Sequence, residues 1–294
     1  MATAATTLRL VERGQLTLED PVRDHLPYFE VIYPEAEQPP ITIRHLLNHT
    51  SGLPDTMPAM IGWVNYDDSA EDQTALLQRE LPNFNKLRFT PGRDRAYTNL
   101  GYMVLGAIIE ATTGESYESV ITAEILQPLG MTNTAFIYTP DMAQHEAVGS
   151  HPMVNMFTPF LPFMVDMDAL VRERVGTRYW FNRFYIDATP PTGLIGSAVD
   201  AARLMSALSE GDILLTPASL ALMRPNGDEP PLGWAEFDES GDTWVQHRGG
   251  GPGFATIMRL YPAQKLGIVI TANGTNLESE KLATLIATLK KFTP

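Results

Sequence analysis

The hydrophobic pattern of the chain changes near residue 225, and this change constrains the fold more than any other feature. Before it, apolar residues recur at helical spacing in segments such as 2–13, 99–113 and 197–209. After Pro231 come four runs of β type, joined by short turns of Gly, Asp and Pro. Consecutive strands on short connections predict an antiparallel meander, so the expected class is α+β rather than a repeated βαβ unit.

The same pattern divides the chain into two expected parts. Residues 1–224 form a mostly helical part, and residues 225–294 form sheet strands with a C-terminal helix over about 278–291. Within the first part, residues 151–190 are unusual. Their run MVNMFTPFLPFMVDM is rich in Met and Phe and is broken by Pro159 and Pro162, so it is neither a clean helix nor a clean strand.

Charge and composition exclude several classes of function. The chain has 21 Lys and Arg against 35 Asp and Glu, which gives a net charge of −14 over 294 residues. This balance excludes general nucleic-acid binding and a polybasic membrane contact, because both need a surplus of positive charge. The absence of cysteine excludes a disulfide scaffold, a thiolate nucleophile and a cysteine-bound metal. No apolar run is long enough for a transmembrane helix, and the opening segment does not have the pattern of a signal peptide, so the compartment stays undetermined.

Tyr97, Thr98 and Asn99 follow a Pro91-Gly92 turn and open a strongly apolar helix. A tyrosine hydroxyl beside a cation has a lowered pKa and can transfer a proton, and an asparagine amide both donates and accepts hydrogen bonds. The alternative interpretation is structural: Asn99 caps the helix and Tyr97 packs. Taken alone, the tripeptide favours the structural interpretation.

A second candidate cluster runs from His247 to Gly253, at the end of a predicted strand. Its glycines allow backbone N–H groups to approach a ligand closely, as an oxyanion hole requires. A glycine-rich hairpin turn, with His247 as an edge residue, is an equally good interpretation.

Two other groupings are interpreted as structural. His45 and His49 are four residues apart, a spacing found in metal sites, but no third ligand accompanies them. Ser197 lacks the symmetric glycines of a nucleophile elbow and instead fits a helix cap with Asp200. The sequence therefore predicts no metal and no organic cofactor.

Taken in order, these clusters belong to a longer series of motifs. The series is LRLVERGQLTLEDPV, ITIRHLLNHTSGLP, FTPGRDRAYTNLGYMVLGAIIEATTG, GLIGSAVDAARLM and HRGGGPGF. In order and spacing it resembles the serine β-lactamase-related hydrolases, which include class C β-lactamases, D-alanyl-D-alanine carboxypeptidases and family VIII esterases. The resemblance covers about residues 1–135 and 190–275. It is weak over residues 136–190, where it implies a variable segment that builds the substrate pocket. It implies a β-lactamase/transpeptidase-like fold, with an antiparallel sheet flanked by helices.

The resemblance also implies roles for five residues. The Y-x-N motif of the family corresponds to Tyr97, which would share the general acid–base role, and Asn99, which would orient a lysine and the substrate. The third motif, K-T-G or H-x-G, corresponds to His247 and Gly249 in the sequence H-R-G. The main-chain N–H of Gly250 would be one oxyanion donor. The substrate would be a small molecule whose ester, amide or β-lactam bond is cleaved through an acyl-enzyme.

The first motif of the family, S-x-x-K, is absent from the sequence. The chain has five lysines, and the residues three before them are Asn83, Pro262, Glu278, Ala287 and Thr288. Aligning Leu10–Gly14 with the family would place the motif directly before Met1. We therefore expect a chain that lacks the N-terminal helix, the first sheet strands, the nucleophile and the base, and that forms no acyl-enzyme. The alternative is a non-catalytic binding or regulatory relative that keeps the cleft.

The remaining candidates concern substrate binding and association. Arg248 is a candidate substrate contact, although its side chain should point to the strand face opposite His247. Because His247 is only partly charged at neutral pH, a neutral ester or amide is favoured over a specialised β-lactam. Phe157, Phe160 and Phe163 could wall an acyl-chain pocket or form a hydrophobic plug. A sheet without its first strands would expose an edge through which copies of the chain could associate.

Overall fold

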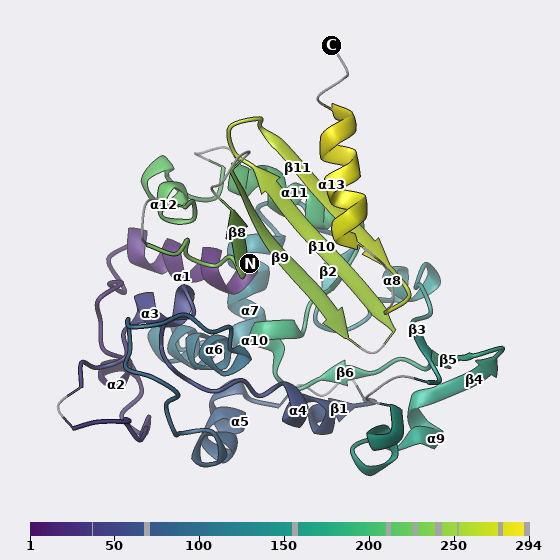
Figure 1. Ribbon diagram of the computed structural model, residues 1–294, viewed down its shortest axis with the longest axis horizontal. Coiled ribbons are helices and arrows are strands. Elements are labelled where there is room, and N and C mark those ends of the chain that lie inside the picture. The colour runs from purple at the N-terminus through teal and green to yellow at the C-terminus, as the bar shows by residue number, and fades with distance from the viewer. Residues whose placement is uncertain are drawn as a thin grey trace.

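The main sheet is built from the C-terminal part of the chain. The computed structural model describes all residues except 37, 68–70, 155–157, 210–212, 226–228, 239–242, 252, 276–278 and 291–294. In it, the main sheet has the strand order β11-β10-β9-β8 (Figure 1). The strands are β8 (Glu236–Asp238), β9 (Trp244–Gly251), β10 (Phe254–Tyr261) and β11 (Leu266–Ala272). Each strand pairs antiparallel with the next along the chain, so the predicted meander is confirmed.

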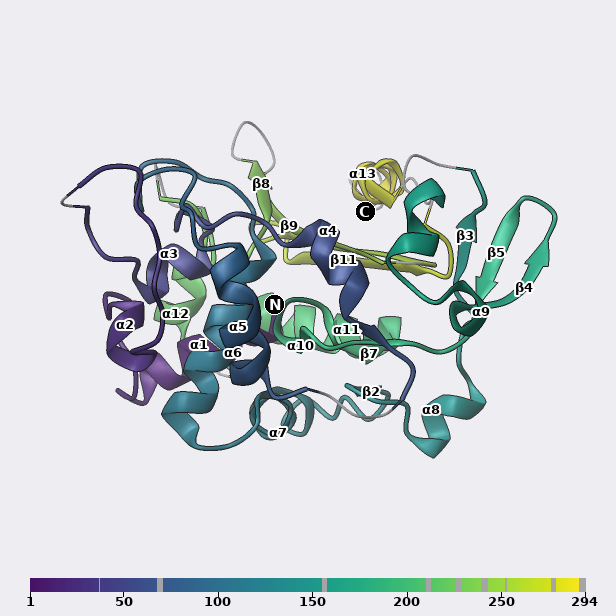
Figure 2. The same ribbon diagram turned by 90° about the horizontal axis from the view of Figure 1, so that it is seen from below.

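One helix covers each face of this sheet. Helix α13 (Ser279–Lys290) lies on one face and α11 (Ala198–Ser209) on the other, as Figure 2 shows with the sheet nearly edge-on. Because alternate residues of a strand point to opposite faces, Ile268 packs with the α13 side while Gly267 faces α11. A Cβ atom at Gly267 would lie 2.7 Å from Met205 Cγ of α11. Only glycine therefore permits this helix to pack so closely on β11.

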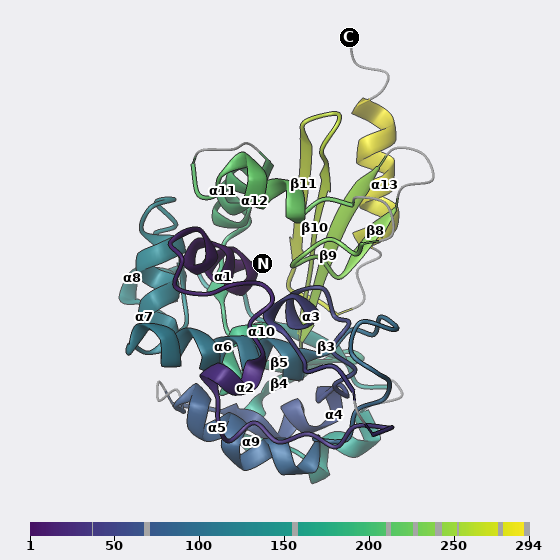
Figure 3. The same ribbon diagram turned by 90° about the vertical axis from the view of Figure 1, so that its left-hand side faces the viewer.

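The other helices bury the larger core to one side of the sheet (Figure 3). At its centre is α6 (Asn99–Thr113), which is buried from Asn99 to Ile109 and ends at a left-handed Gly114 with φ 74°. The helices that pack against it are α1 (Ala2–Glu12), α2 (Val22–His25), α3 (Ile43–Leu47), α5 (Gln73–Glu80), α7 (Tyr117–Ile121) and α10 (Thr189–Thr192). A π turn (Thr122–Leu126) extends α7, and the short helices α4 (Met57–Met60) and α12 (Pro217–Leu222) complete this part.

Helix α1 is buried along most of its length because its small residues allow close packing. The Cβ atom of Ala4 lies only 2.7 Å from the position that a Cβ atom at Gly233 would occupy. Thr3 Oγ1 donates a hydrogen bond to the carbonyl oxygen of Pro190 at 2.7 Å, which satisfies its polar group inside the core. The helix is followed by the left-handed Gly14, as its sequence predicts.

The segment 136–190 is more regular than its sequence predicts. It holds a three-stranded antiparallel sheet with the order β3-β5-β4. On β4 four of the five residues are exposed, so no alternation of buried and polar residues marks the strand. The elements of the segment are α8 (Pro140–Gln144), β3 (Ser150–Pro152), a 3₁₀ turn (Thr158–Phe163), α9 (Met167–Leu170), β4 (Val171–Val175), β5 (Arg178–Phe181) and β6 (Tyr185–Ile186).

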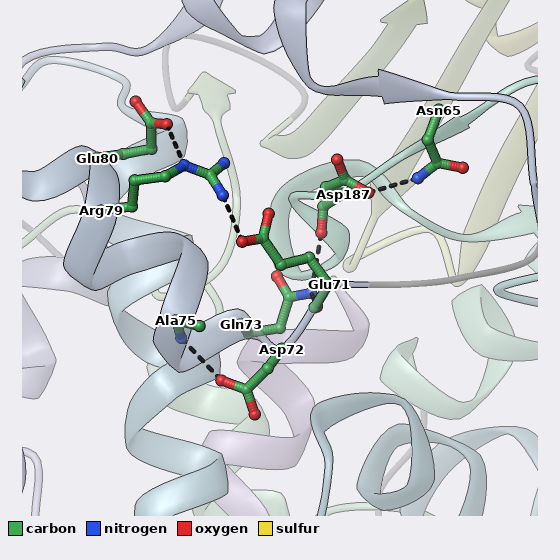
Figure 4. A network of polar contacts seen from close by, with 8 residues as sticks. All are labelled: Asn65, Glu71, Asp72, Gln73, Ala75, Arg79, Glu80 and Asp187. Carbon is green, nitrogen blue, oxygen red and sulfur yellow. Dashed lines mark hydrogen bonds and ion pairs between the residues drawn. The ribbon is translucent and has the colours of Figure 1, made fainter.

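Two short strand pairs and a polar network fix this segment to the helical part. Strand β1 (Val64–Asn65) pairs with β6, and β2 (Thr134–Ala135) pairs with β7 (Ile195–Gly196). In Figure 4, Gln73 Nε2 donates to the carbonyl oxygen of Asp187 at 2.8 Å, and Asn65 Nδ2 donates to the Asp187 carboxylate. Gln73 begins α5, so the network joins α5 to β1 and to the end of the segment.

Three further features bear on the sequence predictions. Strand β11 is an edge strand, because no described strand pairs with its free side. The division of the chain near residue 224 stays a prediction, since α11 precedes this point in sequence but packs on β11. No helix in the described ranges has both the length and the apolar character needed to cross a membrane.

Candidate active site

The beginning of α6 presents two of the candidate residues together. Thr98 is the N-cap of this helix: its backbone is extended, and its Oγ1 accepts from the N–H of Gly101 at 3.4 Å. The capping role that the structural interpretation gave to Asn99 therefore belongs to Thr98. The Tyr97 hydroxyl donates to Asn99 Oδ1 at 3.2 Å, so the two polar side chains of the Y-x-N motif are in direct contact.

The Asn99 side chain is held in one orientation by Asp55. Asp55 Oδ1 accepts from both the backbone N–H and the Nδ2 group of Asn99, each at 3.0 Å. It also accepts from the N–H of Thr56 at 2.8 Å. With Nδ2 turned toward a carboxylate, the Oδ1 atom of Asn99 faces Tyr97. Asp55 thus determines which end of the amide is offered to a ligand.

His49 lies behind Tyr97 and is fully buried. Its ring centroid is 4.5 Å from that of Tyr97 and 5.2 Å from that of Tyr102. Its backbone is left-handed, with φ 61°, and its Nδ1 atom accepts from the N–H of Thr98 at 3.4 Å. Nε2 has no hydrogen-bond partner in the described part of the molecule. The ring therefore fixes the Tyr97 side chain by packing and the Thr98 backbone by a hydrogen bond.

His247 reaches the same place from β9, 150 residues further along the chain. Its ring centroid lies 6.1 Å from that of Tyr97, with the planes 69° apart in an edge-on contact. Its Nδ1 atom lies 3.0 Å from the carbonyl oxygen of Arg248. The structure therefore brings the Tyr97–Asn99 cluster and the His247 cluster together, as the resemblance implies.

The electrostatic surroundings keep both histidines neutral. Burial lowers the pKa of His49 to about 3, helped by the charges of Arg95, His247 and the Met1 amino group. Burial and the Met1 amino group also lower the pKa of His247 well below its usual value. Met1, the N-cap residue of α1, therefore lies near both rings. At neutral pH, His247 supplies no positive charge to a substrate.

Tyr97 does not have the lowered pKa expected of a proton-transferring tyrosine beside a cation. Burial and the nearby Asp55 carboxylate raise its pKa to about 12. The phenol is therefore protonated at neutral pH and acts as a hydrogen-bond donor. The charge that the described surroundings place beside Tyr97 is negative, whereas a lowered pKa would require a cation there.

The glycines of β9 leave an open strand edge beside His247. Strand β8 pairs with β9 only at Trp244, Val245 and Gln246, while β10 continues along the other side to Gly251. Gly249 and Gly250 are exposed, and a Cβ atom at Gly250 would meet nothing within 4 Å. From His247 onward, one side of the β9 backbone is thus free of other described strands. An extended ligand could add along it.

The residues proposed as substrate contacts have surroundings that fit this role less well than those of Tyr97, Asn99 and His247 fit theirs. Arg248 pairs with Glu236 of β8 at 2.7 Å, so its charge is already balanced. Phe160 and Phe163 are 59% and 88% exposed, while Leu161 between them is buried, so these two phenylalanines do not form a hydrophobic plug. Phe157 lies outside the described residues. An acyl-chain pocket near Phe160 remains a proposal.

The other candidate groupings have structural roles. His45 Nδ1 accepts from the N–H of Thr42 at 3.1 Å and so completes a capping box for α3. Since α3 ends at Leu47, His45 and His49 do not share a helical face. Ser197 Oγ accepts from Asp200 N–H at 3.2 Å and caps α11 as predicted. No group of three or more His, Asp or Glu side chains suited to a metal occurs within the described ranges.

Two site residues escaped the sequence analysis. Asp55 is not among the residues that the sequence singles out, and the sequence favours a structural role for His49 over a metal-binding one. The signal for both is in the sequence HTSGLPD, where residues 49–55 directly follow a capped helix and contain Gly52. Gly52 is left-handed there, and a Cβ atom on it would lie 2.2 Å from the Phe89 carbonyl oxygen. This close approach brings the two loops together and places Asp55 and His49 against Tyr97 and Asn99.

Comparison with known proteins identifies the family. A family model described as Beta-lactamase matches residues 1–290, and the chain belongs to this family. It is 29% identical to protein flp of Staphylococcus aureus (strain N315), over 97% of this chain and 52% of the relative. It is 32% identical to penicillin-binding protein 4* of Bacillus subtilis (strain 168), over 92% of this chain and 58% of the relative.

The fold agrees with this assignment. A D-amino acid amidase from Ochrobactrum anthropi SV3 superimposes with a TM-score of 0.75 at 21% identity, over 99% of this chain and 82% of that chain. The expected β-lactamase/transpeptidase-like fold is therefore confirmed. The chain spans about half the length of the curated relatives it matches, 52% of protein flp and 58% of penicillin-binding protein 4*.

Proposed function

We propose that this chain carries the second and third motifs of an acyl-transfer site that hydrolyses a small ester, amide or β-lactam. The observation that supports this most strongly is the contact between Tyr97 and His247. Their rings meet at 6.1 Å although 150 residues separate them in sequence. A structural role for either cluster alone gives no reason for both to converge on an open, glycine-lined strand edge.

Each residue has a proposed role that fits its surroundings. Asn99, oriented by Asp55, offers Oδ1 to a cationic base or to the substrate. Tyr97 takes part in proton transfer once a cation lies beside it and lowers its pKa. His247 and Gly249 line the strand edge, and the N–H of Gly250 is one oxyanion donor. The other donor and the nucleophile would come from the first motif.

We propose that these 294 residues by themselves form no acyl-enzyme, because the sequence has no S-x-x-K motif. A protonated Tyr97 and neutral histidines leave the described site without an activated nucleophile. Met1 is the N-cap of α1, and its amino group lies close to His49 and His247. A preceding helical turn carrying Ser and Lys would thus enter the site. Incubation with p-nitrophenyl acetate tests the inactivity, and saturable turnover by the 294-residue protein would contradict it.

The assignment of Tyr97 and Asn99 can be tested with an extended protein in which Ser-Gly-Ala-Lys precedes Met1. We expect this extension to hydrolyse a short p-nitrophenyl ester, and Tyr97→Phe to remove most of that activity. Tyr102→Phe is the matched control, because the Tyr102 hydroxyl donates only to the Leu47 carbonyl oxygen, at 3.2 Å. Equal losses for the two substitutions would count against the assignment.

The electrostatics favour a neutral ester or amide over a carboxylate-bearing lactam. His247 is uncharged at neutral pH, and Arg248 is paired with Glu236. No fixed cation on β9 is therefore left to hold a substrate carboxylate at this edge. The extended protein should cleave the p-nitrophenyl ester faster than nitrocefin, and the reverse order would contradict this preference.

The second candidate is a non-catalytic binding protein that keeps the cleft. Two observations favour it: Tyr97, Asn99 and His247 lie together, and the sequence has no S-x-x-K motif. In this case the 294-residue protein would bind a short acyl-D-alanyl-D-alanine peptide without cleaving it, and Gly250→Val would weaken binding by crowding the strand edge. Absence of saturable binding in calorimetry would exclude this candidate for that class of ligand.

Self-association through β11 is also proposed. The strand consists of uncharged residues and has one free side in the described sheet. Replacement of the exposed Thr271 by Lys should reduce concentration-dependent association in sedimentation velocity. A monomer at every concentration would rule out this mode.

A further inference from the structure

A groove of about 470 Å³ lies on the α13 face of the main sheet. It is lined by Arg259 of β10 and by Lys281, Thr284, Leu285 and Thr288 of α13. His247 points to the opposite face of the sheet, because it pairs with Met258, the neighbour of Arg259. The groove is therefore separate from the candidate active site.

The buried charge of Arg259 is the feature of this groove that indicates a bound anion. Its side chain is 5% exposed, yet no carboxylate contacts it in the part of the chain that the structure describes. Its guanidinium donates instead to Gln246 Oε1 at 2.5 Å, to Thr284 Oγ1 at 3.1 Å and to the Tyr261 hydroxyl at 3.3 Å. Buried charges in proteins are normally paired, because removing them from water is costly.

The rest of the groove suits an anion with a small apolar part. Among the described lining residues there are two cations, two hydroxyl groups and no acid. Leu285, which is 53% exposed, supplies apolar surface. The guanidinium of Arg259 also lies over the Trp244 ring, 4.6 Å from its centroid, which leaves the fork of the side chain fixed in one plane. A planar fork matches a carboxylate.

We propose that this groove binds a small organic anion, with Arg259 as its main contact and Lys281 at its rim. A carboxylate would supply the counter-charge that Arg259 lacks. The Thr284 hydroxyl, which accepts from Arg259, would donate to one of its oxygens. An aliphatic chain of a few carbons would lie against Leu285. This site does not depend on the proposed hydrolase function.

Hydrogen bonds connect the groove to the strand that carries His247. Gln246, which accepts from Arg259, is fully buried and donates through Nε2 to Glu236 at 2.9 Å. Glu236 in turn accepts from Arg248 at 2.7 Å. Gln246 is thus the one residue between Arg259 and Glu236, so an anion bound to Arg259 could alter the hydrogen bond between Glu236 and Arg248.

Titration calorimetry with sodium hexanoate on the 294-residue protein tests the proposal. We expect saturable binding at neutral pH and no binding of hexylammonium, which has the same chain and the opposite charge. Lys281→Glu reverses the charge at the rim and should weaken hexanoate binding at least fivefold. Lys86→Glu makes the same change at an exposed position in the helical part and should alter it less than twofold.

Arg259→Met should abolish binding. If that variant does not fold, as judged by circular dichroism, Lys281→Glu and Leu285→Ala carry the test, because both positions are exposed. No saturable binding of hexanoate to the unaltered protein would overturn the proposal. So would equal weakening by Lys281→Glu and Lys86→Glu, or binding of hexylammonium as tight as that of hexanoate.

Discussion

The carboxylate of Asp55 accepts both N–H groups that Asn99 offers to it, from the backbone and from the side-chain amide, at 3.0 Å each. Asp55→Ala would leave these groups and the N–H of Thr56 without their acceptor at the start of α6. We expect a loss of about 1–3 kcal/mol in the free energy of unfolding. Urea denaturation measures this loss.

Asp94→Ala is the matched control for this substitution. Asp94 is exposed, and its carboxylate accepts only from the N–H of the adjacent Arg95, at 2.7 Å. Its removal should change the free energy of unfolding by less than about 0.5 kcal/mol. Equal effects of the two substitutions would show that Asp55 does not position Asn99.

His49 makes stability depend on pH in the mildly acidic range. Its pKa is about 3 in the folded protein and 6.5 for an ordinary histidine, so the unfolded chain binds a proton that the folded protein does not. Stability is therefore lost as pH falls from about 6.5 toward 3. His49→Asn tolerates the left-handed backbone and removes the titrating group. This variant should show a shallower decline between pH 7 and pH 5.

The measurement is urea denaturation at pH 7, 6 and 5. His145→Asn, at an exposed position, is the control and should keep the slope of the unaltered protein. His45 and His247 also have lowered pKa values and continue to contribute in both variants. An unchanged slope for His49→Asn would contradict the assignment of this pH dependence to His49.

Alanine substitutions at Gly52 and Gly114 distinguish the cost of a left-handed backbone from the cost of a steric clash. Both are left-handed, with φ 78° and 74°, but only Gly52 would bring a Cβ atom into contact, at 2.2 Å from the Phe89 carbonyl oxygen. Gly114→Ala should cost about 1 kcal/mol for the conformation alone. Gly52→Ala should cost about 1–3 kcal/mol more, since the loops must separate. Thermal denaturation of the two variants gives the comparison, and similar losses would refute the close approach.

Much of the fold could be predicted from periodicity and end signals. The Ser197 cap of α11 and the four strands after Pro231 are local patterns, and the structure confirms them. The β3-β5-β4 sheet could not be predicted in this way. Its strand β4 is mostly exposed and carries charged residues, so the strand is formed by pairing with β5 rather than by burial of one face.

Prediction of the candidate site from the sequence is limited in the same way, because contacts between distant segments leave no local pattern. Tyr97, Asn99 and His247 were found because their residue types carry chemistry and their order matches a family. Asp55 and His49 act by contact with residues more than forty positions away, and such contacts depend on the packing of loops. The pKa of Tyr97 likewise depends on which charge lies beside it in space, and here that charge is Asp55.

The central claim is that Tyr97, Asn99 and His247 form part of an acyl-transfer site whose nucleophile and base are not in this sequence. Intact-mass spectrometry after treatment with a fluorophosphonate tests it most directly. The 294-residue protein should show no adduct, and the protein extended by Ser-Gly-Ala-Lys before Met1 should show one adduct per chain. A stoichiometric adduct on the 294-residue protein would contradict the claim.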